Sequence, residues 1–110
     1  MEAVCRGAQR AGGTTVGILP GHDPREANRH VDLAIPTGMG LSRNAIVARA
    51  GEAVVALGGS HGTLSEIAFA LQFGKTVIGI RTWKIEGVRE ADGAAEALRA
   101  LDALYERPGR

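Results

Sequence analysis

The sequence predicts a Rossmann-like α/β fold, a doubly wound parallel sheet with helices on both faces. Short apolar runs such as Ala53–Leu57 and Thr76–Ile80 alternate with segments of helical period, which is typical of buried parallel strands joined by helices. Glycine makes up 16 of the 110 residues, about twice its usual share, and falls between these segments, where turns need it. We therefore expect one ligand-binding domain over residues 1–110, with a frayed tail at 107–110.

Each element is assigned from β-branched runs, helical periodicity and the glycines and prolines that interrupt them. The expected elements of the first half are a helix over Met1–Ala11, a strand over Thr14–Leu19, a loop over His22–His30, a strand over Val31–Ile35 and a helix over Leu41–Ala50. Those of the second half are a strand over Ala53–Leu57, a helix over Thr63–Phe73, a strand over Thr76–Ile80 and a helix over Ala91–Tyr105. A doubly wound fold usually begins with a strand and a glycine-rich turn, whereas this chain opens into a helix. The first βαβ unit is therefore expected to be absent from the chain.

Composition excludes several classes of function. The net charge of +1 favours neither nucleic acid nor a membrane surface as partner, and no apolar run approaches the roughly 20 residues of a membrane span. Cys5 is the single cysteine, which rules out an internal disulfide, argues against a metal site built on cysteines and suits a reducing cytoplasm. A buried small residue is a better interpretation of Cys5 than a catalytic thiol. The small core predicts a homo-oligomer, built on a dimer.

The segment from Gly58 to Glu66 is the strongest candidate site. It follows a buried strand and opens a helix, so its glycines allow a tight turn and close approach of a ligand, and the free amides at the helix start favour an anion such as phosphate. The expected contacts are Gly58, Gly59, Ser60, His61, Gly62 and Thr63, with Thr63 as a helix cap or a ligand donor. The loop is neither a Walker A nor a GxGxxG sequence, and His61 has no flanking metal-ligand residue, so no metal site is expected. The alternative is a loop that only turns the chain.

A second segment, Thr37–Asn44, also follows a strand and opens a helix, so it is expected to reach the same edge of the sheet. Thr37, Gly38 and Asn44 are the expected ligand contacts, and Arg43 could clamp a phosphate or carboxylate with two hydrogen bonds. Solvent-exposed polar residues are the alternative, as they are for Asn28 and His30 in the preceding loop. Glu66, in the first turn of its helix, has two equally weighted interpretations, a favourable charge at the helix start or a carboxylate that handles a ligand hydroxyl or an oxocarbenium-like centre.

The stretches PTGMGLSRN and GGSHGTLSE together resemble the lysine-decarboxylase-like superfamily, SLOG, whose LOG members are cytokinin-activating nucleoside 5′-monophosphate phosphoribohydrolases. MEAVCRGAQRAGGTTVGILPG and GKTVIGIRTW are similar to its branch of molybdenum cofactor carrier proteins. This resemblance covers Met1–Trp83 and implies that the family carries a further strand, helix and strand before the residue that is Met1 here.

The resemblance to the hydrolases implies Arg43 and Glu66 as the catalytic pair, with phosphate held around Gly59, Gly62 and Thr63. Three residues depart from the hydrolase pattern: Gly58 replaces proline, Ser60 replaces a glycine and Asn44 replaces lysine. These changes favour a carrier that holds a phosphorylated pterin, such as the molybdenum cofactor, or a nucleotide. The alternatives are a hydrolase that cleaves the N-glycosidic bond, and a fragment that binds no ligand.

Overall fold

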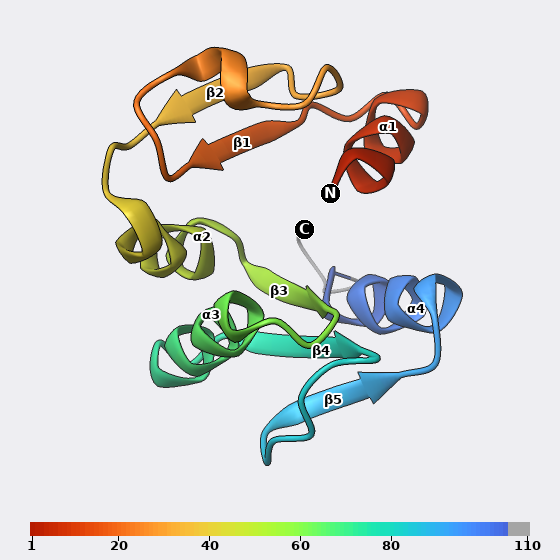
Figure 1. Cartoon of the computed structure of the whole chain (residues 1–110). Coiled ribbons are helices and arrows are strands. Elements are labelled where there is room, and N and C mark those ends of the chain that lie inside the picture. Colours follow the sequence, from red (N-terminus) through yellow and green to blue (C-terminus); the bar gives the residue numbers. More distant parts are fainter. Residues whose placement is uncertain (106–110) are drawn as a thin grey trace. The chain divides into compact units, whose positions relative to one another are not determined.

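The computed structural model describes residues 1–105, and the tail predicted at 107–110 lies outside them. The chain forms two compact units, Met1–Arg43 and Asn44–Arg110, and each has a parallel sheet of its own (Figure 1). The predicted α/β class with parallel strands is confirmed, although the strands of this chain form two sheets. A single domain over residues 1–110 stays a prediction.

The first unit is a two-stranded parallel sheet with one α-helix. Its elements are α1 (Glu2–Arg10), β1 (Val16–Leu19), the 3₁₀ turn η1 (Pro24–Glu26), β2 (Leu33–Pro36) and the 3₁₀ turn η2 (Gly40–Ser42). In the ladder, Val16 lies opposite Leu33 and Leu19 lies opposite Pro36. Both strands begin two residues later than the sequence predicts.

Hydrogen bonds at the amino ends of β1 and β2 hold the first unit together. The Asp32 carboxylate accepts hydrogen bonds from the Thr15 amide at 2.8 Å and from the Gln9 side-chain amide of α1 at 2.8 Å. The bond from the Thr15 amide is the main cause that lowers the pKa of Asp32, and the bond from Gln9 lowers it further. A two-stranded sheet has little core, so these polar contacts fix where α1 lies against it.

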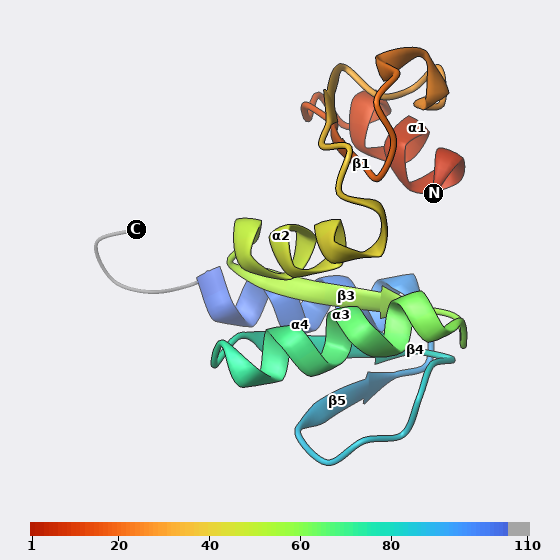
Figure 2. The same ribbon diagram turned by 60° about the vertical axis from the view of Figure 1, so that its left-hand side comes forward.

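The second unit is a three-stranded parallel sheet in the order β3-β4-β5, with helices on both faces (Figure 2). Its elements are α2 (Arg43–Ala50, whose first residue belongs to the first unit), β3 (Ala53–Leu57), α3 (His61–Gln72), β4 (Thr76–Ile80), β5 (Val88–Ala91) and α4 (Ala94–Tyr105). The sequence predicts all of these except β5, and it places Ala91, the last residue of β5, in the closing helix.

Two apolar clusters cover the two faces of β4. Val77 packs with Ile67 and Ala70 of α3 and with Ala48 of α2. Ile78, its neighbour on the opposite face, packs with residues of α4. Both β4 side chains are at most 1% exposed, so β4 is the central strand of this unit.

Among residues 1–105, strand β3 is covered on one face only. Val54 and Ala56 are buried on the face of α3, whereas Val55 and Leu57 on the face of α4 are 38% and 41% exposed. The strand is also an edge of its sheet, because β4 is its only partner in the part of the chain that the structure describes. The sequence predicts a strand buried on both faces, so β3 has the composition of a central strand in an edge position.

No helix among residues 1–105 is long and apolar enough to cross a membrane.

Candidate functional site

The glycine-rich loop lies where β3 ends and α3 begins. Gly58 turns the chain with φ +80°, a conformation that favours glycine, and α3 then starts at His61. The Ser60 side chain caps the helix by accepting the Thr63 amide at 3.1 Å. The cap is thus Ser60 rather than Thr63, and the helix starts two residues before the predicted Thr63. Thr63 contributes its hydroxyl to the same cap, 2.9 Å from that of Ser60.

The outer side of this loop is open. A Cβ atom added at Gly58 or Gly59 would meet no atom of the described residues within 4 Å. In the structure as described, no residue accepts the amides of His61 and Gly62, which begin helix α3. These amides and the positive end of the helix dipole give the loop the chemistry of an anion site.

A segment from the end of β4 holds the carbonyl groups of the loop. Thr82 donates its hydroxyl to the Gly58 carbonyl at 2.5 Å, and the Trp83 indole donates to the Ser60 carbonyl at 3.0 Å. We call Arg81–Lys84 the strap. Because its side chains occupy these carbonyls, the loop is fixed with its amides available for a ligand.

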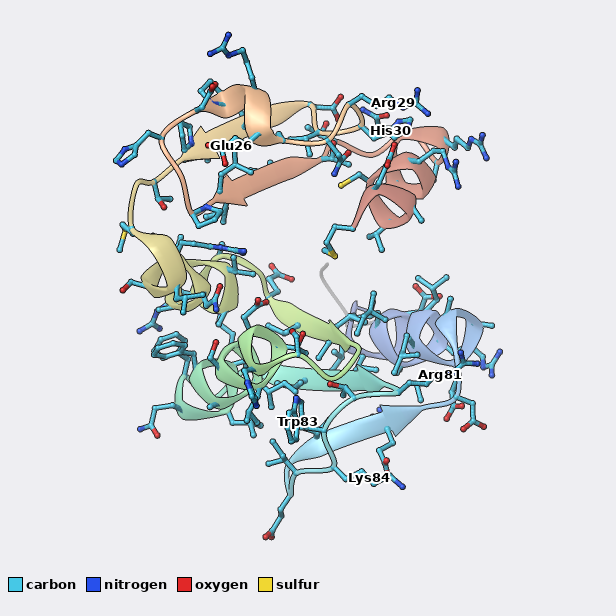
Figure 3. The ribbon with its side chains drawn as sticks, in the orientation of Figure 1. Glu26, Arg29, His30, Arg81, Trp83 and Lys84 are labelled. Carbon is cyan, nitrogen blue, oxygen red and sulfur yellow. The ribbon has the colours of Figure 1, made fainter. Side chains whose placement is uncertain are left out.

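The strap also borders a pocket of about 560 Å³ at the carboxyl ends of β4 and β5. Trp83 stacks on His61 of the loop, with the ring centroids 6.0 Å apart and an interplanar angle of 23°. The pocket is lined by Gly79, Arg81, Thr82, Trp83, Lys84, Glu90, Ala91 and Asp92. Figure 3 shows the side chains of Arg81, Trp83 and Lys84 along the strap. No site residue was predicted in this region, although the stretch GKTVIGIRTW contains Arg81–Trp83 and Trp83 is the single tryptophan of the chain.

Asn44 is connected to the glycine-rich loop by a chain of two hydrogen bonds. Its side chain is buried and donates to the Ser65 hydroxyl at 2.9 Å, and Ser65 donates to the Gly62 carbonyl at 2.7 Å. This chain of hydrogen bonds connects α2 to the first turn of α3. Asn44 therefore positions Gly62 through Ser65.

Thr37 and Gly38 lie in the first unit, at the carboxyl ends of its two strands. The Thr37 hydroxyl donates to the Leu19 carbonyl at 2.7 Å, and the Gly38 amide donates to the Gly21 carbonyl at 2.9 Å. Gly38 has φ +64°, and a Cβ there would lie 2.6 Å from the His22 ring. These two residues join the loops that follow β1 and β2.

The predicted catalytic pair falls on different units. Arg43 is the last residue of the first unit and the first residue of α2, whereas Glu66 lies half-buried on α3 in the second unit. Their action as a pair stays a prediction.

Asn28 and His30 lie away from the carboxyl ends of the strands. The His30 carbonyl accepts the Thr15 hydroxyl just before β1, and its ring lies 3.2 Å from the Gln9 side chain of α1. The Asn28 side chain contacts the Cys5 sulfur of α1 at 3.8 Å. Both residues therefore anchor the loop to α1. Within residues 1–105 no group of three histidine, cysteine or acidic side chains could hold a metal ion.

Comparison with known proteins finds a family pattern and a related protein that both match most of this chain. The pattern of the SLOG cluster4 family matches residues 1–104. An uncharacterised protein of Archaeoglobus fulgidus is 40% identical over 99 residues, which are 89% of this chain and 65% of that protein. The chain thus spans about two-thirds of the length of this relative.

Two solved structures share the fold. The molybdenum cofactor binding protein of the phototrophic bacterium Rippkaea orientalis has a TM-score of 0.84 at 31% identity, over 92% of this chain and 68% of that one. The molybdenum cofactor carrier protein of Chlamydomonas reinhardtii has a TM-score of 0.81 at 33% identity, over 97% and 71%. The family pattern covers almost the whole chain, and these structures share its Rossmann-like architecture. The chain belongs to the SLOG cluster4 family.

Proposed function

We propose that this protein binds a phosphate-bearing small ligand at the glycine-rich loop and carries it unchanged. The ligand class that we favour is a phosphorylated pterin such as the molybdenum cofactor. The phosphate would accept hydrogen bonds from the amides of residues 59–62, at the positive end of the α3 dipole.

The observation that carries the proposal is that the carbonyl groups of the loop have hydrogen-bond partners whereas two of its amides do not. The carbonyls of Gly58 and Ser60 accept hydrogen bonds from the strap, whereas the first two amides of α3 have no acceptor among the described residues. An anion is the partner that such amides favour, and the open surface above Gly59 admits one. The two solved relatives, a molybdenum cofactor binding protein and a molybdenum cofactor carrier protein, support a cofactor of this kind.

We further propose that the protein is cytoplasmic and acts as a homo-oligomer. The exposed apolar side chains of β3, Val55 and Leu57, are the surface that would gain most from association.

The test is a titration with inorganic phosphate followed by NMR. We expect the His61 and Gly62 amide signals to shift first, because these amides have no acceptor among residues 1–105. Gly59→Ala should weaken binding at least tenfold, because its methyl group would occupy the open space where the anion approaches. The same methyl group meets no atom of the protein, so the fold should be retained.

Gly7→Ala is the matched control, since a Cβ at this position of α1 also meets no atom. Shifts confined to another surface, or equal binding by both variants, would contradict the proposed site.

A further inference from the structure

We propose that the pocket at the carboxyl ends of β4 and β5 binds the heterocycle of the ligand and selects a 2-amino-4-oxo pyrimidine ring, which pterin and guanine share. This inference rests on the proposed function, because the phosphate of the same ligand would lie on the glycine-rich loop.

The pocket lies close enough to the glycine-rich loop, and is large enough, to hold the heterocycle of a ligand whose phosphate is bound at the loop. Its volume, about 560 Å³, is within the range of small-molecule sites. Strand β4 pairs with β3, so the carboxyl ends of neighbouring strands carry the pocket and the loop. The Thr82–Gly58 hydrogen bond joins them directly. A ligand with a phosphate at one end and a ring at the other can therefore occupy both.

The charges around the pocket match the edge of that ring. Arg81 and Lys84 line it from the strap, and Glu90 and Asp92 line it from the end of β5. Across residues 1–105, none of these four side chains makes an ion pair with another residue. A carboxylate accepts two parallel hydrogen bonds from a ring N–H and its neighbouring amino group, and a guanidinium or ammonium donates to the 4-oxo group.

Adenine does not offer this arrangement. Its amino group adjoins a ring nitrogen that is an acceptor, which would face the carboxylate lone pairs. A site built to satisfy two donors discriminates against a ring that lacks one of them.

The strap is shaped for this role. Arg81 is the one non-glycine residue with positive φ, +49°, in the described part of the chain, and such conformations concentrate at binding sites. The Trp83 ring forms an apolar wall whose orientation is fixed by its hydrogen bond to Ser60 and its stacking on His61. Figure 3 shows Arg81, Trp83 and Lys84 following one another along this segment.

The test uses the emission of Trp83, which is the single tryptophan and lines the pocket. The probes are 6-hydroxymethylpterin, guanosine and adenosine, none of which carries a phosphate. We expect the pterin and guanosine to quench the emission, with affinities at least tenfold higher than that of adenosine. Calorimetry on the same samples measures the affinities independently of the emission.

The variant is Glu90→Gln with Asp92→Asn, which keeps the shape of both side chains and removes the charges. We expect it to lose at least tenfold in pterin affinity and to keep the phosphate-induced shift of the Gly62 amide. Glu86→Gln is the matched control, because Glu86 is exposed and does not line the pocket.

Equal affinity for adenosine and guanosine would overturn the inference, as would unchanged pterin binding by the double variant. Phosphate shifts at Gly62 without any pterin binding would overturn the inference and leave the proposed function standing. Pterin binding that depends on the two carboxylates, without phosphate shifts, would support the pocket and overturn the phosphate site.

Discussion

Side chains from distant parts of the sequence determine which polar groups of the glycine-rich loop are left without a hydrogen-bond partner among residues 1–105. Thr82 and Trp83 hold its carbonyls, and Asn44 holds Gly62 through Ser65. Hydrogen bonds of this kind lower the freedom of the loop before any ligand arrives. The anion affinity that we propose for the loop would therefore depend on side chains that lie outside the loop itself.

Glu66 distinguishes a carrier from a hydrolase. In a hydrolase its carboxylate would act when positive charge develops on the ribose, and Glu66→Ala would cost roughly 10²–10³ in turnover. We predict a carrier, so neither the wild type nor Glu66→Ala should release adenine from AMP in a chromatographic assay. Phosphate affinity should be unchanged or higher in the variant, because a like charge is removed. Adenine release by the wild type that is lost in the variant would establish the hydrolase instead.

Asp32 makes the first unit sensitive to acid. Hydrogen bonds from Thr15 and Gln9 favour the charged carboxylate, so its pKa in the folded chain lies below the ordinary value of 3.8. Its contribution to stability is complete above the unfolded pKa and is lost as the pH falls through the folded one. We expect the Thr15 amide signal to titrate below pH 3.8 and the Asp32→Asn variant to lose this dependence. A Thr15 signal that is constant in that range would contradict the assignment.

At the scale of elements, the strap packs so closely against β4 and β5 that no side chain fits at Gly79. A Cβ added at Gly79 of β4 would lie 2.6 Å from the Thr82 methyl group and 2.9 Å from Val88 of β5. Gly79 is therefore required where the strap folds back over the end of its own strand.

We predict that Gly79→Ala destabilises the chain by about 1–3 kcal/mol, the usual range for an overpacked site. Because Thr82 must move, the variant should also bind phosphate more weakly. Urea unfolding measures the first effect and the amide titration the second. Gly93→Ala is the control, since a Cβ there meets no atom, and equal stability of the two variants would refute the packing argument.

Whether an element can be predicted from the sequence depends on how far its side chains are buried. Strand β4 is predictable because both of its faces are buried, so its residues form an unbroken apolar run. Strand β5 is not, because Arg89 and Glu90 are exposed on an edge strand and interrupt the pattern. The glycine-rich loop is predictable because its residues are consecutive. The strap is not, because its hydrogen bonds join residues 23 and 24 positions apart that have no joint pattern in the sequence.

At the scale of the whole molecule, apolar surface remains for association. Each of the two sheets is small, and among residues 1–105 β3 has one strand partner, β4, and carries the exposed side chains Val55 and Leu57 on one face. Apolar strands at sheet edges tend to pair or to be covered. A second copy of the chain is the partner that we propose.

We predict a dimer at micromolar concentration by sedimentation. Val55→Thr with Leu57→Lys should shift it towards the monomer, because both side chains lie on the uncovered face of β3. Leu33→Lys is the control, because Leu33 and its neighbour Ile35 are also exposed but lie on a different strand, β2. A well-folded monomer of the wild type would contradict the prediction.

The strap has a further consequence, for the kinetics and heat of binding. Since Thr82 and Trp83 order the glycine-rich loop when the chain folds, little conformational entropy remains to be lost on binding. Association should then be a single step whose observed rate rises linearly with ligand concentration, without the plateau of a preceding rearrangement. The carrier would load its cargo at a rate limited by encounter, and the lifetime of the complex would be determined by the dissociation rate.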